Sequence, residues 1–122
     1  MLETILAMLA PTYVEQNTRM EITAVRQYVK SHYSETQWKC LDELWQRESS
    51  WQTKKKPWRA RNPSSGAYGI PQALPAAKMV SHGVDFATNP YTQVNWGMSY
   101  IKSRYKGSPC RALQFHDRKG WY

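Results

Sequence analysis

The sequence predicts a mainly α-helical protein of one domain, with at most a small β-hairpin between residues 51 and 70. A chain of 122 residues can enclose one hydrophobic core but is too short for two. In several segments apolar residues recur every three or four positions, and most of these segments begin with helix-capping residues. Alternating valine-rich runs, which would mark strands, are lacking.

The first 34 residues are predicted to form a helical extension packed on the domain of residues 35–122, although an independent partner-binding arm would have the same pattern. Apolar residues with helical spacing open the chain: Leu2, Ile5, Leu6 and Leu9. Thr18 and Glu21 then form a capping-box pattern. The segment that follows places three apolar residues on one side: Ile22, Val25 and Val29.

Three more helices are predicted from their start signals. Ser34 with Gln37 forms a second capping box, and the helix behind it carries an apolar arc of Trp38, Leu41, Leu44 and Trp45. Asn89 followed by proline starts the next helix, whose core stripe is Val94, Gly97, Met98, Ile101 and Tyr105. Ser108 followed by proline starts the last helix, and Gly120 ends it.

Glu48 is the most informative residue of the chain. At about 100° per residue it falls in the middle of the apolar arc of its helix, whereas Asp42 lies at the margin and Glu43 points away. Partial burial and the C-terminal end of the helix dipole both disfavour a negative charge, so we expect a raised pKa for Glu48. A general acid near neutral pH needs this property. A glutamate that reaches out to water is the alternative.

A second polar and aromatic face is predicted on the helix that starts at Asn89. Gln93, Trp96 and Tyr100 project together, away from the core stripe. Rings stack on sugar faces and amides bond hydroxyl groups, so this face suits a saccharide cleft. The same two rings would also suit a core position beneath the Glu48 helix.

Charge favours a polyanionic partner, because the net charge is +8. The cations concentrate in one loop around Trp58: Lys54, Lys55, Lys56, Arg59 and Arg61. A solvated loop and nucleic-acid binding are two interpretations, and the motifs described next favour a third, contact with an anionic bacterial wall. No nucleic-acid recognition motif is present, so we expect no nucleic-acid partner.

Several motifs in order resemble the lysozyme-like lytic transglycosylase domain, also called soluble lytic transglycosylase or goose-type lysozyme-like. Glu48 with Ser49 matches the Glu-Ser pair that ends the catalytic helix of that family. Gly69-Ile70-Pro71-Gln72 matches its Gly-hydrophobic-hydrophobic-Gln motif. The stretch from Asn62 to Pro75, the residues around Gln93 and the closing Gly120-Trp121-Tyr122 are similar to the actinobacterial and phage branch. The resemblance covers residues 38–122.

The resemblance implies a lysozyme-like helical fold and cleavage of the β-1,4 bond between N-acetylmuramic acid and N-acetylglucosamine in peptidoglycan. Glu48 would be the catalytic acid and base, and the products would end in 1,6-anhydromuramic acid. Together with the helix face described above, the predicted sugar-binding residues are Ser49, Tyr68, Gln72, Gln93, Trp96, Tyr100 and His116. A muramidase that hydrolyses the same bond is the alternative. In that reaction His116 or Asp117 would act as the base that activates a water molecule.

One motif departs from the family. Many members place Ala-Tyr-Asn-Ala-Gly on the last helix, and this chain has Ala112-Leu113-Gln114-Phe115-His116 there. The Tyr-Asn pair has become Phe115-His116, so its contact with the sugar is in question. His116 is a substitute hydrogen-bond donor or a structural residue.

The two cysteines, Cys40 and Cys110, suit either buried thiols in a reducing compartment or a disulfide in an oxidising one. The resemblance favours the disulfide, since the related branch is similar at both positions. Neither cysteine has metal-ligand spacing and the three histidines are scattered, so we expect neither a metal nor another cofactor.

The expected site of action is the bacterial cell wall or periplasm. The first ten residues have an acidic leader and a short apolar run, which fits neither a signal peptide nor a membrane span. Delivery by a phage, through a membrane pore or on the virion, is the preferred interpretation, and a secreted protein without its leader is the other. We expect a monomer. A non-catalytic wall-binding or virion-structural module and a nucleic-acid binder are the alternatives to an enzyme.

Overall fold

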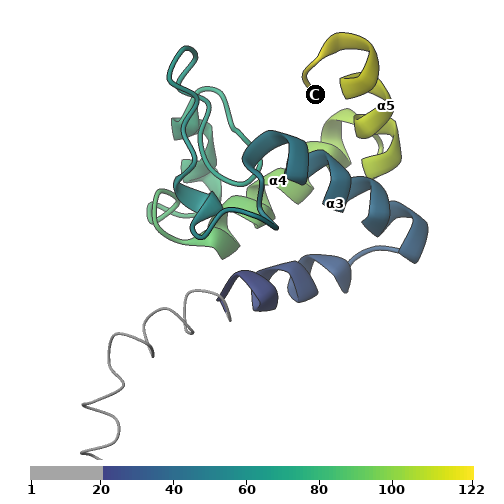
Figure 1. The fold of residues 1–122 in the computed structure, drawn as a ribbon, viewed down its shortest axis with the longest axis horizontal. Helices are drawn as coiled ribbons and strands as arrows, with labels where there is room; N and C mark the ends of the chain where they lie inside the picture. The colour runs from purple at the N-terminus through teal and green to yellow at the C-terminus, as the bar shows by residue number, and fades with distance from the viewer. Residues whose placement is uncertain (1–20) are drawn as a thin grey trace, which may run out of the picture.

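The computed structural model describes residues 21–122, which form helices joined by turn-rich loops (Figure 1). Residues 21–30 are helical, and the α-helices that follow are α3 (Glu35–Ser49), α4 (Pro90–Arg104) and α5 (Pro109–Lys119). Two 3-10 helices, η1 (Pro57–Arg59) and η2 (Ala76–His82), lie between α3 and α4. The predicted mainly helical class is confirmed.

The predicted helix starts are also confirmed. Side-chain oxygens of Ser34, Asn89 and Ser108 accept hydrogen bonds from backbone N–H groups in the first turns of α3, α4 and α5, respectively. Gly120 ends α5 in the left-handed conformation, as expected. The backbone groups at the end of a helix have no hydrogen-bond partner within the helix, and capping residues such as these compensate for that. The helix boundaries could therefore be predicted from the local sequence.

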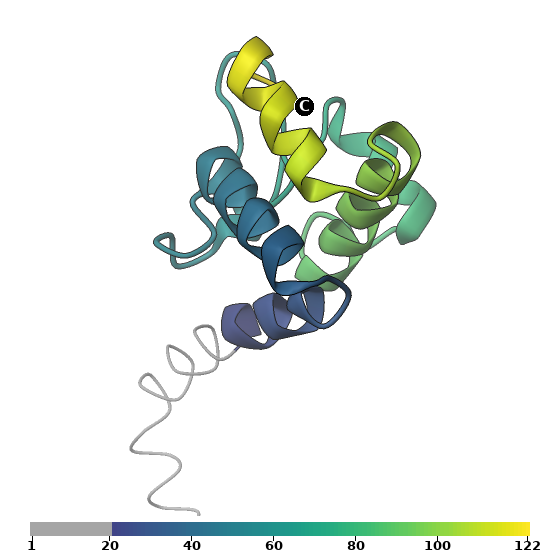
Figure 2. The ribbon, with the colours of Figure 1, turned by 90° about the vertical axis from the view of Figure 1, so that its right-hand side faces the viewer.

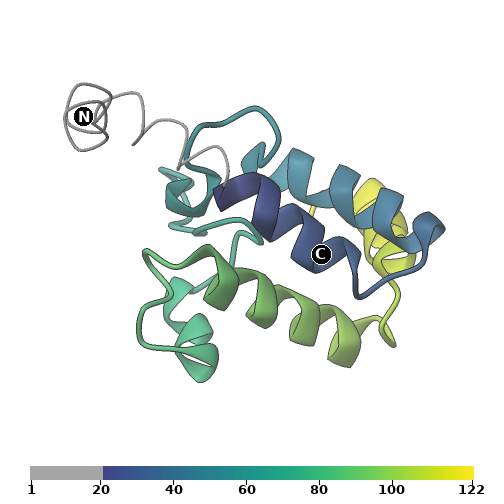
Figure 3. The same cartoon turned by 90° about the horizontal axis from the view of Figure 1, so that it is seen from below.

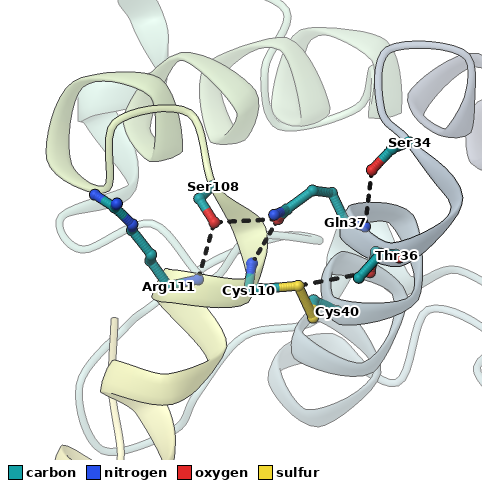
Figure 4. Close-up of a disulfide and its surroundings, with 7 residues drawn as sticks. All are labelled: Ser34, Thr36, Gln37, Cys40, Ser108, Cys110 and Arg111. Atoms are coloured by element: carbon teal, nitrogen blue, oxygen red, sulfur yellow. Dashed lines mark hydrogen bonds between the residues drawn. A yellow bond between two sulfur atoms is a disulfide. The ribbon is translucent and has the colours of Figure 1, made fainter.

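Gln37 differs from the capping-box prediction (Figure 4). The forward half of the box is present, because the Gln37 N–H donates to Ser34 Oγ at 3.3 Å. The Gln37 side chain points to α5 instead, where its Oε1 accepts from Cys110 N at 2.9 Å and from Ser108 Oγ at 3.2 Å. The amide therefore satisfies an unpaired donor at the start of α5 and fixes that helix against α3.

A disulfide between Cys40 and Cys110 joins the same two helices, 70 residues apart in sequence (Figure 4). The pairing implied by the resemblance is confirmed. Cys40 lies on α3 eight positions before Glu48 and Cys110 opens α5 six positions before His116. The bond thus fixes α5 to the helix that carries the candidate catalytic acid.

The helix of residues 21–30 packs into the main core. Figure 3 shows it lying along both α3 and α4. Val25 and Val29 are completely buried, Arg26 pairs with Asp42 of α3 at 3.1 Å, and Tyr28 Oη donates to Asn95 of α4 at 2.6 Å. Within the described residues, this part of the predicted extension therefore packs on the domain and contributes Val25 and Val29 to its main core. The expectations for residues 1–20, including the cap at Thr18, lie outside the described residues.

Tryptophans dominate the main core. The rings of Trp38, Trp45 and Trp51 contact one another, with centroids 5.6 Å apart for Trp38 and Trp51 and 5.3 Å apart for Trp45 and Trp51. Trp58 of η1 belongs to the same buried cluster. Figure 2 shows α5 beside α3. Since these rings are large and buried, much of the aromatic-rich composition serves the core.

The expected hairpin between residues 51 and 70 is reduced to isolated bridges. Tyr68 pairs with Arg61 on one side and with Ala73 on the other, and no continuous strand forms in residues 21–122. Glycines and prolines interrupt the segment too often for a ladder to extend. The result is a compact loop, which covers one side of α4.

Candidate active site

A pocket of about 460 Å³ lies between α3, α4 and the loop after η1. This volume is within the range of small-molecule sites, about 300 to 1,000 Å³. Its wall combines polar, aromatic and apolar residues: Glu48, Asn62, Ser65, Ala67, Pro71, Gln72, Ala73, Leu74, Lys78, Trp96, Tyr100, Arg104, Gly120, Trp121 and Tyr122. Glu48 is the only acidic residue of this wall.

Glu48 lies at the end of α3, because Ser50 adopts a left-handed conformation and ends the helix directly after Ser49. Its side chain is 17% exposed. Burial raises the pKa of Glu48 to about 7. The predicted raised pKa is therefore confirmed, with burial as its cause, and near neutral pH the carboxyl group is present in both its acid and its base form.

His116 of α5 contacts Glu48, with 3.1 Å between Nε2 and Oε1. Burial, aided by the positive charge of Arg47 and opposed by Asp117, lowers the pKa of His116. Both groups are thus shifted toward their neutral forms, so the contact is a neutral O–H to nitrogen hydrogen bond rather than an ion pair when Glu48 is protonated. His116 contacts the acid and is absent from the pocket wall, which differs from the predicted sugar contact.

Three of the predicted sugar-binding residues do line the pocket: Gln72, Trp96 and Tyr100. The Trp96 and Tyr100 rings stack with centroids 5.2 Å apart and planes 15° apart. Gln72 holds its Nε2 on the carbonyl oxygens of Ala60 and Gly69, at 3.0 Å each. These residues give the pocket an aromatic side and a side-chain amide. They are distant in sequence but line the same pocket.

Ser49 and Tyr68, by contrast, do not line the pocket. Ser49 is buried and its hydroxyl donates to the carbonyl of Trp45, one turn earlier in α3, at 3.1 Å. Tyr68 is 8% exposed, and its hydroxyl donates to the carbonyl of Ala87 at 2.7 Å. Both side chains stabilise the backbone next to the site.

Gln93 is also a positioning residue rather than a surface one, because its side chain is completely buried. Its Oε1 accepts from Ile70 N at 2.9 Å, and its Nε2 donates to the carbonyls of Trp58 and Phe86 at 2.7 and 2.8 Å. A Cβ on Gly69 would lie 2.5 Å from Gln93 Oε1, so this close approach needs glycine. One amide thus fixes three loop segments around the pocket.

Replacing Gln93 by methionine is expected to lower the free energy of unfolding by several kcal/mol. The change keeps the length of the side chain but leaves one buried N–H and two carbonyls without their partner, at about 1 to 3 kcal/mol each. Urea denaturation followed by circular dichroism measures the change. Gln114→Met, at an exposed position of α5, is the matched control and should cost less than about 0.5 kcal/mol. Equal stability of the two variants would contradict this role.

The C-terminal segment supplies wall residues that the sequence did not identify as a site. Tyr122 Oη accepts from Trp45 Nε1 at 2.9 Å and donates to the carbonyl of Pro71 at 2.8 Å. Its backbone carbonyl accepts from Tyr100 Oη at 2.9 Å. Burial, with the nearby Glu48 charge, raises the pKa of Tyr122 well above its usual value, so the phenol stays neutral. The segment closes the pocket between α3 and α4.

Gly97 of α4 lies directly against Trp45 of α3 and against Pro71. A Cβ at this position would lie 2.6 Å from Cζ2 of Trp45 and 3.1 Å from Cβ of Pro71. Since contacts below 3.0 Å do not occur in folded proteins without movement, only glycine fits between these groups. Its absent side chain lets Trp45 pack directly on the α4 backbone.

The basic loop is exposed and separate from the pocket. Lys54, Lys56 and Arg59 are exposed, while Trp58 is buried in the core. None of the loop cations lines the pocket. Arg61 lies over the Tyr68 ring, 4.9 Å from its centroid. The loop is therefore a charged surface next to the site and supplies no group to it.

Within residues 21–122 no group of three or more histidine, cysteine, aspartate or glutamate side chains is placed to hold a metal ion. In the same range no helix combines the length and apolar character that a membrane crossing requires. The chain matches no protein-family model, no curated protein and no solved structure. Its function is therefore inferred from the residues of the pocket.

Proposed function

We propose that the protein is a peptidoglycan lytic transglycosylase that cleaves the β-1,4 bond between N-acetylmuramic acid and N-acetylglucosamine. The observation that carries this proposal is a single carboxyl group, Glu48, with a pKa raised to about 7 in an aromatic-walled pocket. The sequence motifs around Glu48 and Gln72 support it as well, because they resemble those of the lysozyme-like transglycosylases. Such an enzyme acts in the bacterial wall or periplasm, where a phage or a secretion route would deliver it.

In the proposed reaction, protonated Glu48 donates its proton to the glycosidic oxygen as the bond to C1 of the muramoyl unit breaks. The acetamido group of the substrate stabilises the positive centre at C1. The Glu48 carboxylate then takes the proton from the C6 hydroxyl of the same sugar as this oxygen bonds to C1. Leaving group and 1,6-anhydro product together hold all atoms of the substrate, so no water is consumed.

His116 fits a positioning role in this reaction. It binds Oε1 of Glu48, and no described donor occupies Oε2, which can face the substrate. With a lowered pKa, neutral His116 accepts the proton of the acid form through Nε2 or donates to the carboxylate in its other tautomer. Both forms of Glu48 are thereby held in place, as a residue with two proton-transfer steps requires.

Mass spectrometry of fragments released from purified peptidoglycan tests the reaction class. We expect muropeptides that end in 1,6-anhydromuramic acid and are one water lighter than hydrolysed ends. The C6 hydroxyl is intramolecular and outcompetes water, since no second acid lines the pocket. Asp117 is half exposed and pairs with Arg47. His116→Ala should leave the product type unchanged, and mainly borohydride-reducible ends would mean a muramidase instead.

Activity should decline as the pH rises above about 7. The first step needs the acid form of Glu48, whose pKa is raised to about 7, so kcat/KM should be level below this pH and fall tenfold per pH unit well above it. Initial rates of wall solubilisation between pH 5 and 9, at constant ionic strength, measure the profile. Circular dichroism at each pH controls for unfolding. A decline that starts near pH 4.5 would show an unshifted carboxyl group.

A further inference from the structure

We infer that Arg104 recognises a carboxylate on the saccharide bound in the pocket, which makes the site selective for acidic sugar chains. This inference rests on the proposed function, because it names the substrate feature that the same pocket reads. Arg104 lies at the end of α4 and lines the pocket, yet it plays no part in the proton transfers assigned to Glu48.

Aromatic rings hold the guanidinium of Arg104 in place. Its Cζ lies over four rings, at 5.1 Å from the centroid of Trp121, 5.7 Å from Phe115, 5.9 Å from Tyr105 and 6.0 Å from Tyr100. The rings come from α4, α5 and the C-terminal segment. A group stacked in this way has already lost much of its rotational freedom, so binding an anion costs little further ordering.

The charge of Arg104 has no acidic partner among the described residues. Arg26 and Arg47, in contrast, each bond carboxylates of the protein: Asp42 for the first, Glu43 and Asp117 for the second. A solvent-exposed arginine without a carboxylate is common on surfaces. One that lies among four aromatic rings at the edge of a pocket is placed to receive an anion from a ligand.

The rest of the pocket wall strengthens this positive character. Its charged residues are Glu48, Lys78 and Arg104. Because burial favours the neutral form of Glu48, the two cations are not balanced by a full negative charge near neutral pH. A purely neutral saccharide would leave both cations without a partner, whereas an acidic one would be attracted and oriented.

The planar fork of a guanidinium matches a carboxylate with two parallel hydrogen bonds. On the proposed substrate, carboxylates occur in two places. One is the lactyl group on C3 of the muramoyl sugar, where it carries no peptide, and the other is the peptide attached to that lactyl group. Both are close to the bond that would be cleaved, so one arginine at the pocket edge would set the register of the chain over Glu48.

Binding measurements by calorimetry, in the non-cleaving Glu48→Gln background, test the inference. The first pair of probes is the tetrasaccharide of alternating N-acetylglucosamine and N-acetylmuramic acid, with its lactyl groups as free carboxylates or as primary amides. The second pair carries peptide stems with free or amidated carboxylates. We expect the acid form of at least one pair to bind about tenfold more tightly, and the responding pair identifies the carboxylate.

Arg104→Met removes the charge but keeps an apolar stem for the rings, so it should abolish the acid preference. Lys102→Met is the matched control, because Lys102 is an exposed cation on the same turn of α4 and does not line the pocket. This control should keep the preference. Raising the salt concentration should reduce the preference in the protein with Arg104 intact, a readout that needs no folded Arg104 variant.

Equal affinity for acid and amide in both pairs would overturn the inference, as would a preference that survives Arg104→Met or an absence of binding to all four probes. Digestion of purified walls by the unmutated protein reports separately on the proposed function. Wall cleavage without acid preference would leave the transglycosylase proposal standing and remove Arg104 from it. An acid preference that depends on Arg104, without wall cleavage, would support carboxylate recognition by Arg104 and contradict the transglycosylase proposal.

Discussion

Replacing Glu48 by glutamine is expected to reduce wall lysis by at least about 10³-fold while making the protein more stable above pH 7. Glutamine keeps the shape and hydrogen-bonding capacity of the side chain but cannot donate the required proton. General acid or base catalysis contributes about 10² to 10⁴-fold per step, and Glu48 serves both steps of the proposed reaction. Turbidity loss of purified walls measures the activity.

The stability gain follows from the same burial. The folded chain binds the Glu48 proton more tightly than the unfolded chain, since its pKa rises from 4.5 to about 7. Wild-type stability therefore falls as the pH rises from about 4.5 to about 7, and the deficit is complete above 7, at roughly 3 kcal/mol. Glutamine does not titrate, so the variant lacks this deficit, and the two proteins should be equally stable near pH 4.

Thermal or urea unfolding at pH 4 and pH 8 measures this difference. A folded Glu48→Gln protein that clears walls at nearly the wild-type rate would remove Glu48 from the mechanism and favour a different catalytic group. If the folded wild-type protein binds glycan but releases no fragments from walls, a non-catalytic wall-binding module would be favoured. The combination of lost lysis and increased stability at pH 8 is particular to a buried, functional carboxyl group.

Removal of the disulfide is expected to lower the free energy of unfolding by a large amount. The Cys40→Ser, Cys110→Ser double variant opens a loop with a sequence separation of 70, which costs roughly 4 kcal/mol in the chain-entropy model. Such a loss is a large fraction of the stability of a domain of this size. Urea unfolding of the oxidised protein, the reduced protein and the double variant measures it.

Reductant should destabilise the wild-type protein to about the level of the double variant and leave that variant unchanged, which is the internal control. Activity should fall with stability at temperatures where α5 separates from α3, because His116 then leaves Glu48. Intact mass after non-reducing preparation is the direct check of the bond. Two free thiols in an oxidising buffer would contradict the pairing.

The parts of the fold that sequence predicted are those that local chemistry determines. Ser34, Asn89 and Ser108 cap helices with their own side chains, so their roles are visible within four residues of sequence. The burial of Glu48 was predictable for the same reason, since its position on the helical arc depends only on the residues of α3. The disulfide needed the family resemblance, because two cysteines alone leave the compartment open.

Long-range packing decided what sequence did not predict. Helical spacing correctly predicts that Gln93 points away from the apolar stripe of its helix. It does not predict that residues 57–59 and 69–71 cover the side chain, so Gln93 is buried where a cleft residue was expected. Tyr122 and Arg104 belong to the pocket because the C-terminal segment returns to α3 and α4. Gln37 had two candidate partners, and the donor at Cys110, distant in sequence, is the one it binds.

Gly97 contributes to the shape of the pocket through its contacts with Trp45 and Pro71. Glu48 and the Trp96 and Tyr100 rings come from α3 and α4, respectively, and the separation of those helices depends on how closely Trp45 approaches the α4 backbone. The Trp45 ring cannot turn aside without losing its bond to Tyr122. The position of the aromatic wall opposite the acid thus depends on the absence of one methyl group, because any larger residue at position 97 would displace Trp45 or the pocket residue Pro71.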